Sequence, residues 1–517
     1  MTRRLVLGPF NRVEGDLEVQ LDVADGLVKA ARVNAPMFRG FELMLAGREP
    51  MDALTIVPRI CGICSVSQSV AAARALADAC GVVAPPNGEL VTNLMLACEN
   101  LADHLTHFYL FFMPDFTSPV YAGRRWYAQA QQRFAALAGS PTGGGLHSRM
   151  ALAARARWFE LVGTLGGKWP HTGTILPGGS ARAIEATERV RLLARVREMR
   201  AFLEQTLFGT PLEEVAALHS LAALEAWRQR AAGSDLALFL DIADDTGLAA
   251  LGPGPGRYLS YGAYAQADGT HAFARGVWSA AQQSVLPLDT DQITEDPRHA
   301  WYAEPYDVDV DAAADANTCA SPNALHPSVG STQPQADKAG AYTWNKAPRL
   351  AGQVLETGAI ARQLVDGQPL IRAAVAARGG CVSTRVLARL LEVARIVPLM
   401  TQWLQALQPH APFYAAHTLP DNAQGVGLTE AARGALGHWL RIENGRLSHY
   451  QIVAPTSWNF SPRDAAGTPG ALEAALVGAP LDNTLVVSAL GDATGNTSVA
   501  VQHIVRSFDP CMVCTVH

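Results

Sequence analysis

The sequence predicts a mainly α-helical fold with small β elements, an α+β chain that forms a single unit over residues 1–517. Three long stretches repeat apolar residues every three or four positions, which is the pattern of a helix with a buried face. Short runs that alternate apolar and polar residues occur near both ends. Two Cys-x-x-Cys pairs also lie at opposite ends, and a shared site would require the intervening chain to fold around their meeting point.

The long helical stretches cover residues 89–113, 184–208 and 384–407. We expect them to form long central helices, the first of them largely buried. A side chain at Ser383 or Thr384 is a candidate cap for the third helix, and Pro398 is a candidate kink. A further helix is predicted over residues 65–80, directly after the first cysteine pair, where its positive N-terminal end would favour thiolates.

Two β-hairpins are predicted. Apolar and polar residues alternate over residues 16–34, with Asp25 and Gly26 at the turn. A second hairpin is indicated late in the chain by Asn444 and Gly445. Residues 303–340 are acidic and then rich in Ala, Pro and Ser, which predicts a surface loop insertion.

Composition excludes several classes of protein. The chain is 49% hydrophobic and only 17% charged, which fits a high buried fraction or an apolar surface covered by a partner. The net charge of -6 gives no reason to expect nucleic acid. No apolar run approaches the roughly 18 residues of a membrane span. The N-terminus carries no secretory pattern.

The two cysteine pairs, Cys61 with Cys64 and Cys511 with Cys514, can present four thiolates to one centre. A structural zinc site and two unrelated redox pairs are alternatives. Zinc modules usually keep their pairs close in sequence, whereas these pairs lie at opposite ends, and Asp509 precedes the second pair. The remaining cysteines are too scattered to hold an iron–sulfur cluster: Cys80, Cys98, Cys319 and Cys381.

Several further motifs accompany the cysteine pairs in a fixed order. They are Arg12-Val-Glu-Gly15, Arg39-Gly-Phe-Glu42, Arg59-Ile-Cys-Gly-Ile-Cys64, Asp103-His-Leu-Thr-His-Phe-Tyr109, Lys346-Ala-Pro-Arg349, Pro455-Thr-Ser-Trp-Asn459, Pro462-Arg-Asp464 and Ser507-Phe-Asp-Pro-Cys-Met-Val-Cys514. With these motifs the chain resembles the large, catalytic subunit of nickel–iron hydrogenases along most of its length.

The resemblance implies a nickel ion held by all four thiolates. Cys64 and Cys514 would bridge nickel to an iron that carries carbon monoxide and two cyanides, while Cys61 and Cys511 would bind nickel alone. Soft thiolates suit both metals. The resemblance also implies heterolytic splitting of H₂ at this centre, with Cys511 or Arg349 receiving the proton.

The resemblance assigns roles to residues around the metals. Glu14 would take the proton from Cys511, and Arg349, after Pro348, would overhang the open metal position and help to bind one cyanide. Thr456 would donate a hydrogen bond to the other cyanide. Buried carboxylates need partners, and for the carboxylates of Asp103 and Asp509 we expect Arg349 to be the partner.

A magnesium site is implied at the end of the chain. In the family, a histidine at the position of His517 binds Mg²⁺ together with a glutamate, here Glu42, and a backbone carbonyl at about Ile452. Most members continue past this histidine and are cut there. A chain that stops at His517 is a mature product or one made without an extension.

Two departures from the family pattern point to its regulatory, hydrogen-sensing branch: Gln68 and Trp169 each replace a more usual histidine. The implied partners are an iron–sulfur small subunit, which would receive the electrons, and a histidine kinase. The assembly would be a heterodimer or a dimer of heterodimers. The alternatives are an energy-converting uptake hydrogenase with a membrane electron acceptor and a non-catalytic zinc or scaffold protein.

Overall fold

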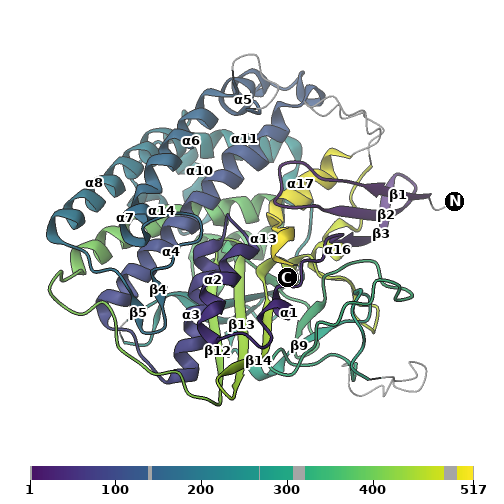
Figure 1. Cartoon of the computed structure of the whole chain (residues 1–517). Coiled ribbons are helices and arrows are strands. Elements are labelled where there is room, and N and C mark those ends of the chain that lie inside the picture. Colours follow the sequence, from purple (N-terminus) through teal and green to yellow (C-terminus); the bar gives the residue numbers. More distant parts are fainter. Residues whose placement is uncertain (1–2, 138–142, 267, 307–320, 482–497, 516–517) are drawn as a thin grey trace.

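The computed structural model describes residues 3–137, 143–266, 268–306, 321–481 and 498–515 (Figure 1). Long helices gather on one side of the molecule, and small sheets occupy the other side. The helices of ten or more residues are α3 (Ser65–Cys80), α4 (Pro86–Thr106), α6 (Leu146–Trp158), α8 (Ala186–Phe202), α10 (Leu221–Arg230), α11 (Asp235–Thr246), α13 (Pro369–Arg378), α14 (Val382–Ala406) and α17 (Val499–Phe508). The predicted α+β class with long central helices is confirmed.

Shorter helices connect these elements. They are α1 (Phe41–Leu45), α2 (Ala53–Ile56), α5 (Tyr127–Phe134), α7 (Glu160–Gly166), α9 (Leu212–Ala216), α12 (Ala359–Val365), α15 (Pro455–Asn459) and α16 (Ala471–Leu476). Single turns of other helix types include η2 (Val57–Ile60) before the first cysteine and η9 (Met512–Cys514) at the last. The two cysteine pairs therefore lie on or directly beside short elements.

Strands form three sheets of three or four strands and two smaller ribbons. The first sheet contains β1 (Arg3–Leu7), β2 (Glu18–Ala24) and β3 (Leu27–Asn34). The second contains β11 (Glu356–Thr357), β6 (Arg257–Ala265), β7 (His271–Ser279) and β8 (Ser284–Leu286) in that order. The third contains β12 (Ala423–Ala431), β13 (Gly434–Glu443) and β14 (Arg446–Val453). The ribbons pair β4 (Ile175–Leu176) with β5 (Gly179–Ser180) and β9 (Ile293–Asp296) with β10 (Ala347–Leu350).

The two central helices, α4 and α14, pack against each other and are buried on nearly all sides. Charged residues are buried within both helices, and they are paired there with other buried groups, as in the contact of Arg389 in α14 with Asp509. The predicted stretch 89–113 is longer than one α-helix, because α4 widens into a π-helix over His107–Phe112. The stretch 184–208 likewise changes to a π-helix at Leu203–Phe208. The predicted cap of α14 is wrong: Cys381 takes the cap position, and no side chain caps it.

Both predicted hairpins are confirmed, and their turn residues explain why. Asp25 and Gly26 between β2 and β3 have φ values of 55° and 71°, and Asn444 and Gly445 between β13 and β14 have 53° and 73°. Asn, Asp and Gly tolerate this left-handed conformation, which matches the twist of a two-residue hairpin turn.

A segment near the N-terminus and the closing segment of the chain meet inside the molecule. Glu14 forms a parallel β-bridge with Cys511. The backbone N–H of Met512 donates to the carbonyl of Glu14 at 2.7 Å, and the N–H of Glu14 donates to the carbonyl of Pro510 at 3.3 Å. This pairing fixes the closing segment of the chain beside its first motif.

The segment predicted as a surface insertion, 303–340, is described only in part. Its residues 321–340 form no helix or long strand, but Thr332 is buried and donates a hydrogen bond to Glu42. The insertion itself stays a prediction. Among the described residues, no helix has the length and apolar character needed to cross a membrane.

Helix α3, which follows Cys64, lies directly on strand β12 because two glycines there lack side chains. A Cβ atom built on Gly427 would stand 1.9 Å from the carbonyl oxygen of Ala71 and 2.5 Å from the amide nitrogen of Ala75. A Cβ atom on Gly425 would stand 2.0 Å from the carbonyl oxygen of Ala75. The close approach of helix and sheet therefore depends on glycine.

We predict that Gly427→Ala lowers the free energy of unfolding by about 1–3 kcal/mol, because the added methyl group must push α3 away from the sheet. Denaturant unfolding of the purified chain measures this. Gly163→Ala is the control, since a Cβ atom on Gly163 in α7 meets no heavy atom within 4 Å. Equal stability of the two variants would contradict the packing described here.

Candidate metal centre

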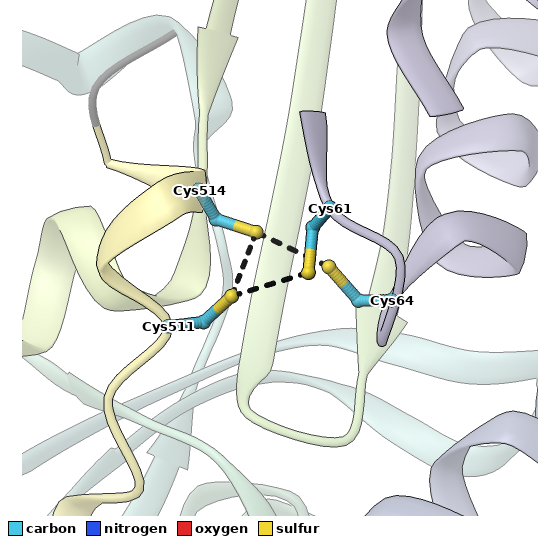
Figure 2. A group of neighbouring side chains, drawn as sticks. All are labelled: Cys61, Cys64, Cys511 and Cys514. Atoms are coloured by element: carbon cyan, nitrogen blue, oxygen red, sulfur yellow. Dashed lines mark hydrogen bonds between the residues drawn. The ribbon is translucent and has the colours of Figure 1, made fainter. Parts of the chain in front are cut away.

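Four cysteine sulfurs from the two ends of the chain converge in the interior (Figure 2). The Sγ atoms of Cys61 and Cys511 lie 3.4 Å apart. The Sγ atom of Cys514 lies 3.1 Å from that of Cys64 and 3.1 Å from that of Cys511. All four sulfurs lie within 4.8 Å of one another, and all four residues are buried. This is the arrangement predicted from the cysteine pairs.

Local structure places each sulfur. Cys61 follows η2, Cys64 caps α3, and Cys511 and Cys514 begin and end the turn around η9. Hydrogen bonds from Cys511 and Cys514 hold the pKa of the Cys61 thiol well below its usual range, because a thiolate there accepts them. Burial raises the pKa of Cys511. The scattered Cys80, Cys98 and Cys381 lie elsewhere, and Cys319 falls outside the described residues.

Glu99, which the sequence analysis passed over, supports the loop that carries Cys64. Its carboxylate accepts from the backbone N–H groups of Val66 at 2.8 Å and Ser67 at 2.9 Å in the first turn of α3. The indole N–H of Trp169 donates to it at 3.1 Å. Burial raises the pKa of Glu99 to about 7. The only hint in the sequence is an acidic residue inside an apolar helix.

A small cavity adjoins the sulfurs, and we call it the sulfur cavity. It is lined by Cys64, Gln68, Ala431, Arg433, Leu436, Pro455, Thr456, Cys511 and Cys514. The hydroxyl of Thr456 accepts from the backbone N–H of Cys511 at 3.1 Å. Its own proton is therefore available for donation to an acceptor other than this amide.

The guanidinium group of Arg433 lies beside the sulfurs and is hydrogen-bonded to two buried carboxylates. Its Nη1 donates to Asp103 at 2.6 Å, its Nη2 donates to the side chain of Asp509 at 3.0 Å, and its Nε donates to the carbonyl of Asp509 at 2.9 Å. Arg389 also donates to Asp509, at 3.2 Å. The resulting chain of charges, Asp103–Arg433–Asp509–Arg389, is entirely buried.

The two carboxylates of this chain differ in their pKa. Burial raises the pKa of Asp103 to about 7, although the charge of Arg433 opposes the rise. Burial also acts on Asp509, but the charges of Arg433 and Arg389 outweigh it and lower the pKa of that carboxyl. The two carboxyl groups thus respond differently to burial, because the neighbouring guanidinium groups outweigh it only at Asp509.

The prediction that Arg349 pairs with Asp103 and Asp509 is wrong. Arg349 donates from Nε to Asp464 at 3.0 Å and from Nη1 to the hydroxyl of Ser461 at 3.2 Å. Strand β10 pairs with β9, and the Pro462-Arg-Asp464 motif meets the guanidinium there. Neither Arg349 nor Pro348 lines the sulfur cavity.

Glu14 lies where its predicted role requires, next to Cys511 in the β-bridge, and it is half-buried. Burial and the nearby charge of Cys61 raise the pKa of Glu14, against the opposing charges of Arg433 and Arg39. A carboxyl group with a raised pKa exchanges protons more readily near neutral pH.

Two of the predicted magnesium ligands are neighbours. The Glu42 carboxylate is buried and accepts from the backbone N–H of Ile452 at 2.8 Å and from the hydroxyl of Thr332. The structure therefore brings Glu42 to the amide of Ile452, while ligation by the carbonyl stays a prediction. His517 lies outside the described residues.

Comparison with known proteins agrees with the four-sulfur geometry. The profile of the nickel-dependent hydrogenases matches residues 39–143 and 146–517. The chain belongs to this family. The periplasmic [NiFeSe] hydrogenase large subunit of Desulfomicrobium baculatum is 29% identical, with 99% of this chain and 95% of the relative covered. The hydrogenase-1 large chain of Escherichia coli is 28% identical, with 100% and 95% covered.

Solved structures show the same relationship. The Ni-Fe-Se hydrogenase of D. vulgaris Hildenborough in the reduced state has a TM-score of 0.81 and 27% identity, and both chains are covered completely. In this chain all four positions of the group are cysteine. Four converging thiolates fit the soft metals nickel and iron. The group is the site of a nickel–iron centre, and the chain is a hydrogenase rather than a zinc or scaffold protein.

We predict that Arg433→Lys lowers the rate of H₂ oxidation per bound nickel by about 10²-fold, because one ammonium cannot reproduce the fixed guanidinium beside the sulfurs. Arg349→Lys is the matched control, since Arg349 is as deeply buried but lies outside the cavity. Steady-state assays with an artificial acceptor give both rates. If Arg349→Lys lowered the rate of H₂ oxidation more than Arg433→Lys, Arg349 rather than Arg433 would be the arginine that acts at the metals.

Proposed function

We propose that this chain splits H₂ heterolytically as the large subunit of a hydrogen-sensing hydrogenase. The observation that carries the proposal is the convergence of four buried cysteine sulfurs. Arg433 lines the sulfur cavity with three of these cysteines, and Glu14 forms the β-bridge with Cys511. The bound nickel–iron centre supplies the site at which H₂ is polarised and its electrons are taken up. The residues around it hold the metals and direct the proton.

In the proposed arrangement all four cysteines would hold nickel, and Cys64 and Cys514 would also hold an iron that carries carbon monoxide and two cyanides. The remaining hydroxyl proton of Thr456 would be donated to one of these cyanides. Arg433 replaces Arg349 in the role above the metals. Its guanidinium is fixed by Asp103 and Asp509 before any reaction begins, so charge that develops at the centre meets a preorganised donor.

The proton leaves through Cys511 and Glu14 in this proposal. The two residues are joined by a backbone bridge, which keeps the carboxyl group near the sulfur. Glu14 is half-buried and so connects the interior with the surface region. The raised pKa of Glu14 lets the carboxyl group accept and release a proton near neutral pH.

A magnesium ion bound by Glu42, the Ile452 carbonyl and His517 would fix the chain end. The position of Glu42 next to the backbone of Ile452 supports this site, because two of the three expected ligand residues are already neighbours.

The electrons require a partner. Within the described ranges, the four cysteines are the one group of metal-ligating side chains close enough to hold an ion. An iron–sulfur small subunit would supply the further redox centres, in a heterodimer or a dimer of heterodimers. Exposed Leu43, Met44 and Met51, on the segment that leads to Cys61, support an apolar docking face near the metals.

The sensing role rests on Gln68 and Trp169. Gln68 lines the sulfur cavity, and Trp169 donates to Glu99 behind Cys64, so both departures from the family pattern act close to the metals. A histidine kinase in the cytoplasm would read the signal. The names of the relatives, which include an uptake hydrogenase large subunit from Rubrivivax gelatinosus, favour an uptake enzyme as the second candidate.

We predict that Glu14→Gln loses H₂/D⁺ exchange by about 10²–10⁴-fold, because the amide cannot relay the proton. The infrared bands of carbonyl and cyanide remain, since Glu14 holds no metal. Glu49→Gln, at an exposed glutamate, is the control and keeps full exchange. Exchange that survives in Glu14→Gln would show that the proton leaves by another group.

The two candidate roles differ in turnover and in partner. A sensor oxidises H₂ more slowly than about 10 s⁻¹, the typical enzyme rate, and binds a histidine kinase of the same organism. Steady-state assays at saturating H₂ and co-purification of the kinase measure the two properties. Faster turnover with transfer to a membrane acceptor, and no kinase binding, would establish the uptake role instead.

A further inference from the structure

A row of three buried side chains leads from the sulfur cavity into the third sheet. His438 on β13 approaches Gln68 on α3, with 3.0 Å between its Nε2 and the amide oxygen Oε1. The Nδ1 of the same ring lies 2.9 Å from the hydroxyl of Tyr450 on β14. All three residues are buried. We call Gln68, His438 and Tyr450 the orienting row.

Hydrogen-bond chemistry fixes the direction of every bond in this row. An amide oxygen only accepts, so the proton on the histidine ring must sit on Nε2. Burial disfavours the doubly protonated, charged ring. In the neutral ring Nδ1 therefore accepts, and the hydroxyl of Tyr450 is the donor. Hydrogen bonds are therefore donated in one direction along the row: Tyr450 donates to His438, and His438 donates to Gln68.

The consequence appears at the other end of the glutamine. Its oxygen is held by His438, so the amide group presents its nitrogen, a donor, on the opposite side. Gln68 lines the sulfur cavity together with Cys64 and Cys514. It also lies one helical turn after Cys64, and its backbone N–H donates to the carbonyl of that cysteine at 3.1 Å.

We propose that His438 and Tyr450 are positioning residues that keep the Gln68 amide nitrogen directed at the sulfurs of Cys64 and Cys514. The N–H group donates a hydrogen bond to one of these thiolates and withdraws electron density from the metals. Without the row, only the thiolates themselves would favour the amide nitrogen over its oxygen, because a thiolate accepts a hydrogen bond and cannot donate one. The inference rests on the proposed role of these two cysteines as bridging ligands.

The row is held rigidly by the fold. His438 and Tyr450 stand on adjacent antiparallel strands, in which His438 pairs with Ile452 and Leu440 pairs with Tyr450. Their rings meet edge to face with centroids 5.6 Å apart. Helix α3 lies tightly on the same sheet through its glycines. The two rings are thus held in place by the sheet, while the terminal amide of Gln68 can exchange its nitrogen and oxygen by turning about its last bond.

Tyr450→Phe is the decisive variant, because it removes only the hydroxyl that donates to Nδ1. The ring proton is then free to move to Nδ1, and Nε2 becomes an acceptor. The glutamine amide turns over to donate to it, and its oxygen faces the sulfurs. Tyr414→Phe is the matched control, since the hydroxyl of Tyr414 lies 3.2 Å from Nδ1 of His417 on the surface.

The first readout is independent of the metals. Nitrogen-15 NMR of histidine-labelled protein reports which ring nitrogen of His438 is protonated, and a His438→Gln variant assigns the signal by its loss. We expect the Nε2–H form in the unaltered protein and in Tyr414→Phe, and a gain of the Nδ1–H form in Tyr450→Phe. An Nδ1–H ring in the unaltered protein would overturn the proposed direction of the row.

The second readout is the carbonyl band of the metal-loaded protein in the infrared. Loss of a donor to the sulfur leaves more electron density on the metals, so Tyr450→Phe shifts the band to lower wavenumber. Gln68→Leu, which removes the amide altogether, shifts it in the same direction, and Tyr414→Phe leaves it unchanged. An unshifted band in both Tyr450→Phe and Gln68→Leu would overturn the contact with the sulfurs.

These outcomes separate the inference from the proposed function. If the unaltered protein showed no carbonyl or cyanide bands, the proposed iron ligands would fail, while the NMR experiment would still decide the direction of the row.

Discussion

The structure depends on one constraint: two ends of a chain of 517 residues must meet in the interior to place four thiolates within 4.8 Å of one another. Thiolates in an apolar interior repel each other and lose their hydration, so only bound cations and a rigid surround hold them there. The β-bridge between Glu14 and Cys511 and the close packing of α3 on β12 supply that surround. The long helices form the core between the two cysteine-bearing segments.

Buried charged groups next to the sulfurs are held in fixed positions, as the packed elements are. The chain of Asp103, Arg433, Asp509 and Arg389 pairs every guanidinium with a carboxylate, which is the condition under which buried charges persist. Its arginine next to the sulfurs is held on two sides, so it cannot relax away when charge changes at the metals. Two uncharged residues, Thr456 and Gln68, also line the sulfur cavity, and each is proposed to donate a hydrogen bond into it. The centre is thus surrounded by donors that are fixed before any reaction.

The sequence was informative where the signal was local or carried by a motif. The cysteine pairs, the hairpin turns at Asp25 and Asn444 and the helix over residues 65–80 all appear as predicted. The ion-pair partner of Arg349 was predicted wrongly because ion pairs join residues that are far apart in sequence. The motif around Arg349 suggests a buried arginine, but only the pairing of β10 with β9 shows that its partner is Asp464. Arg433, in the apolar run between β12 and β13, and Glu99, inside α4, were missed for the same reason. A charged residue amid apolar sequence was the available signal.

The central claim is that the four cysteines hold one nickel and one iron with diatomic ligands. Metal analysis combined with infrared spectroscopy of the purified, natively matured protein tests it most directly. The account predicts one nickel per chain, together with carbonyl and cyanide stretching bands, and the loss of both in Cys514→Ser but not in Cys80→Ser, where the cysteine is half-buried and distant from the group. A protein that contains zinc in place of nickel, and shows no such bands, would contradict it.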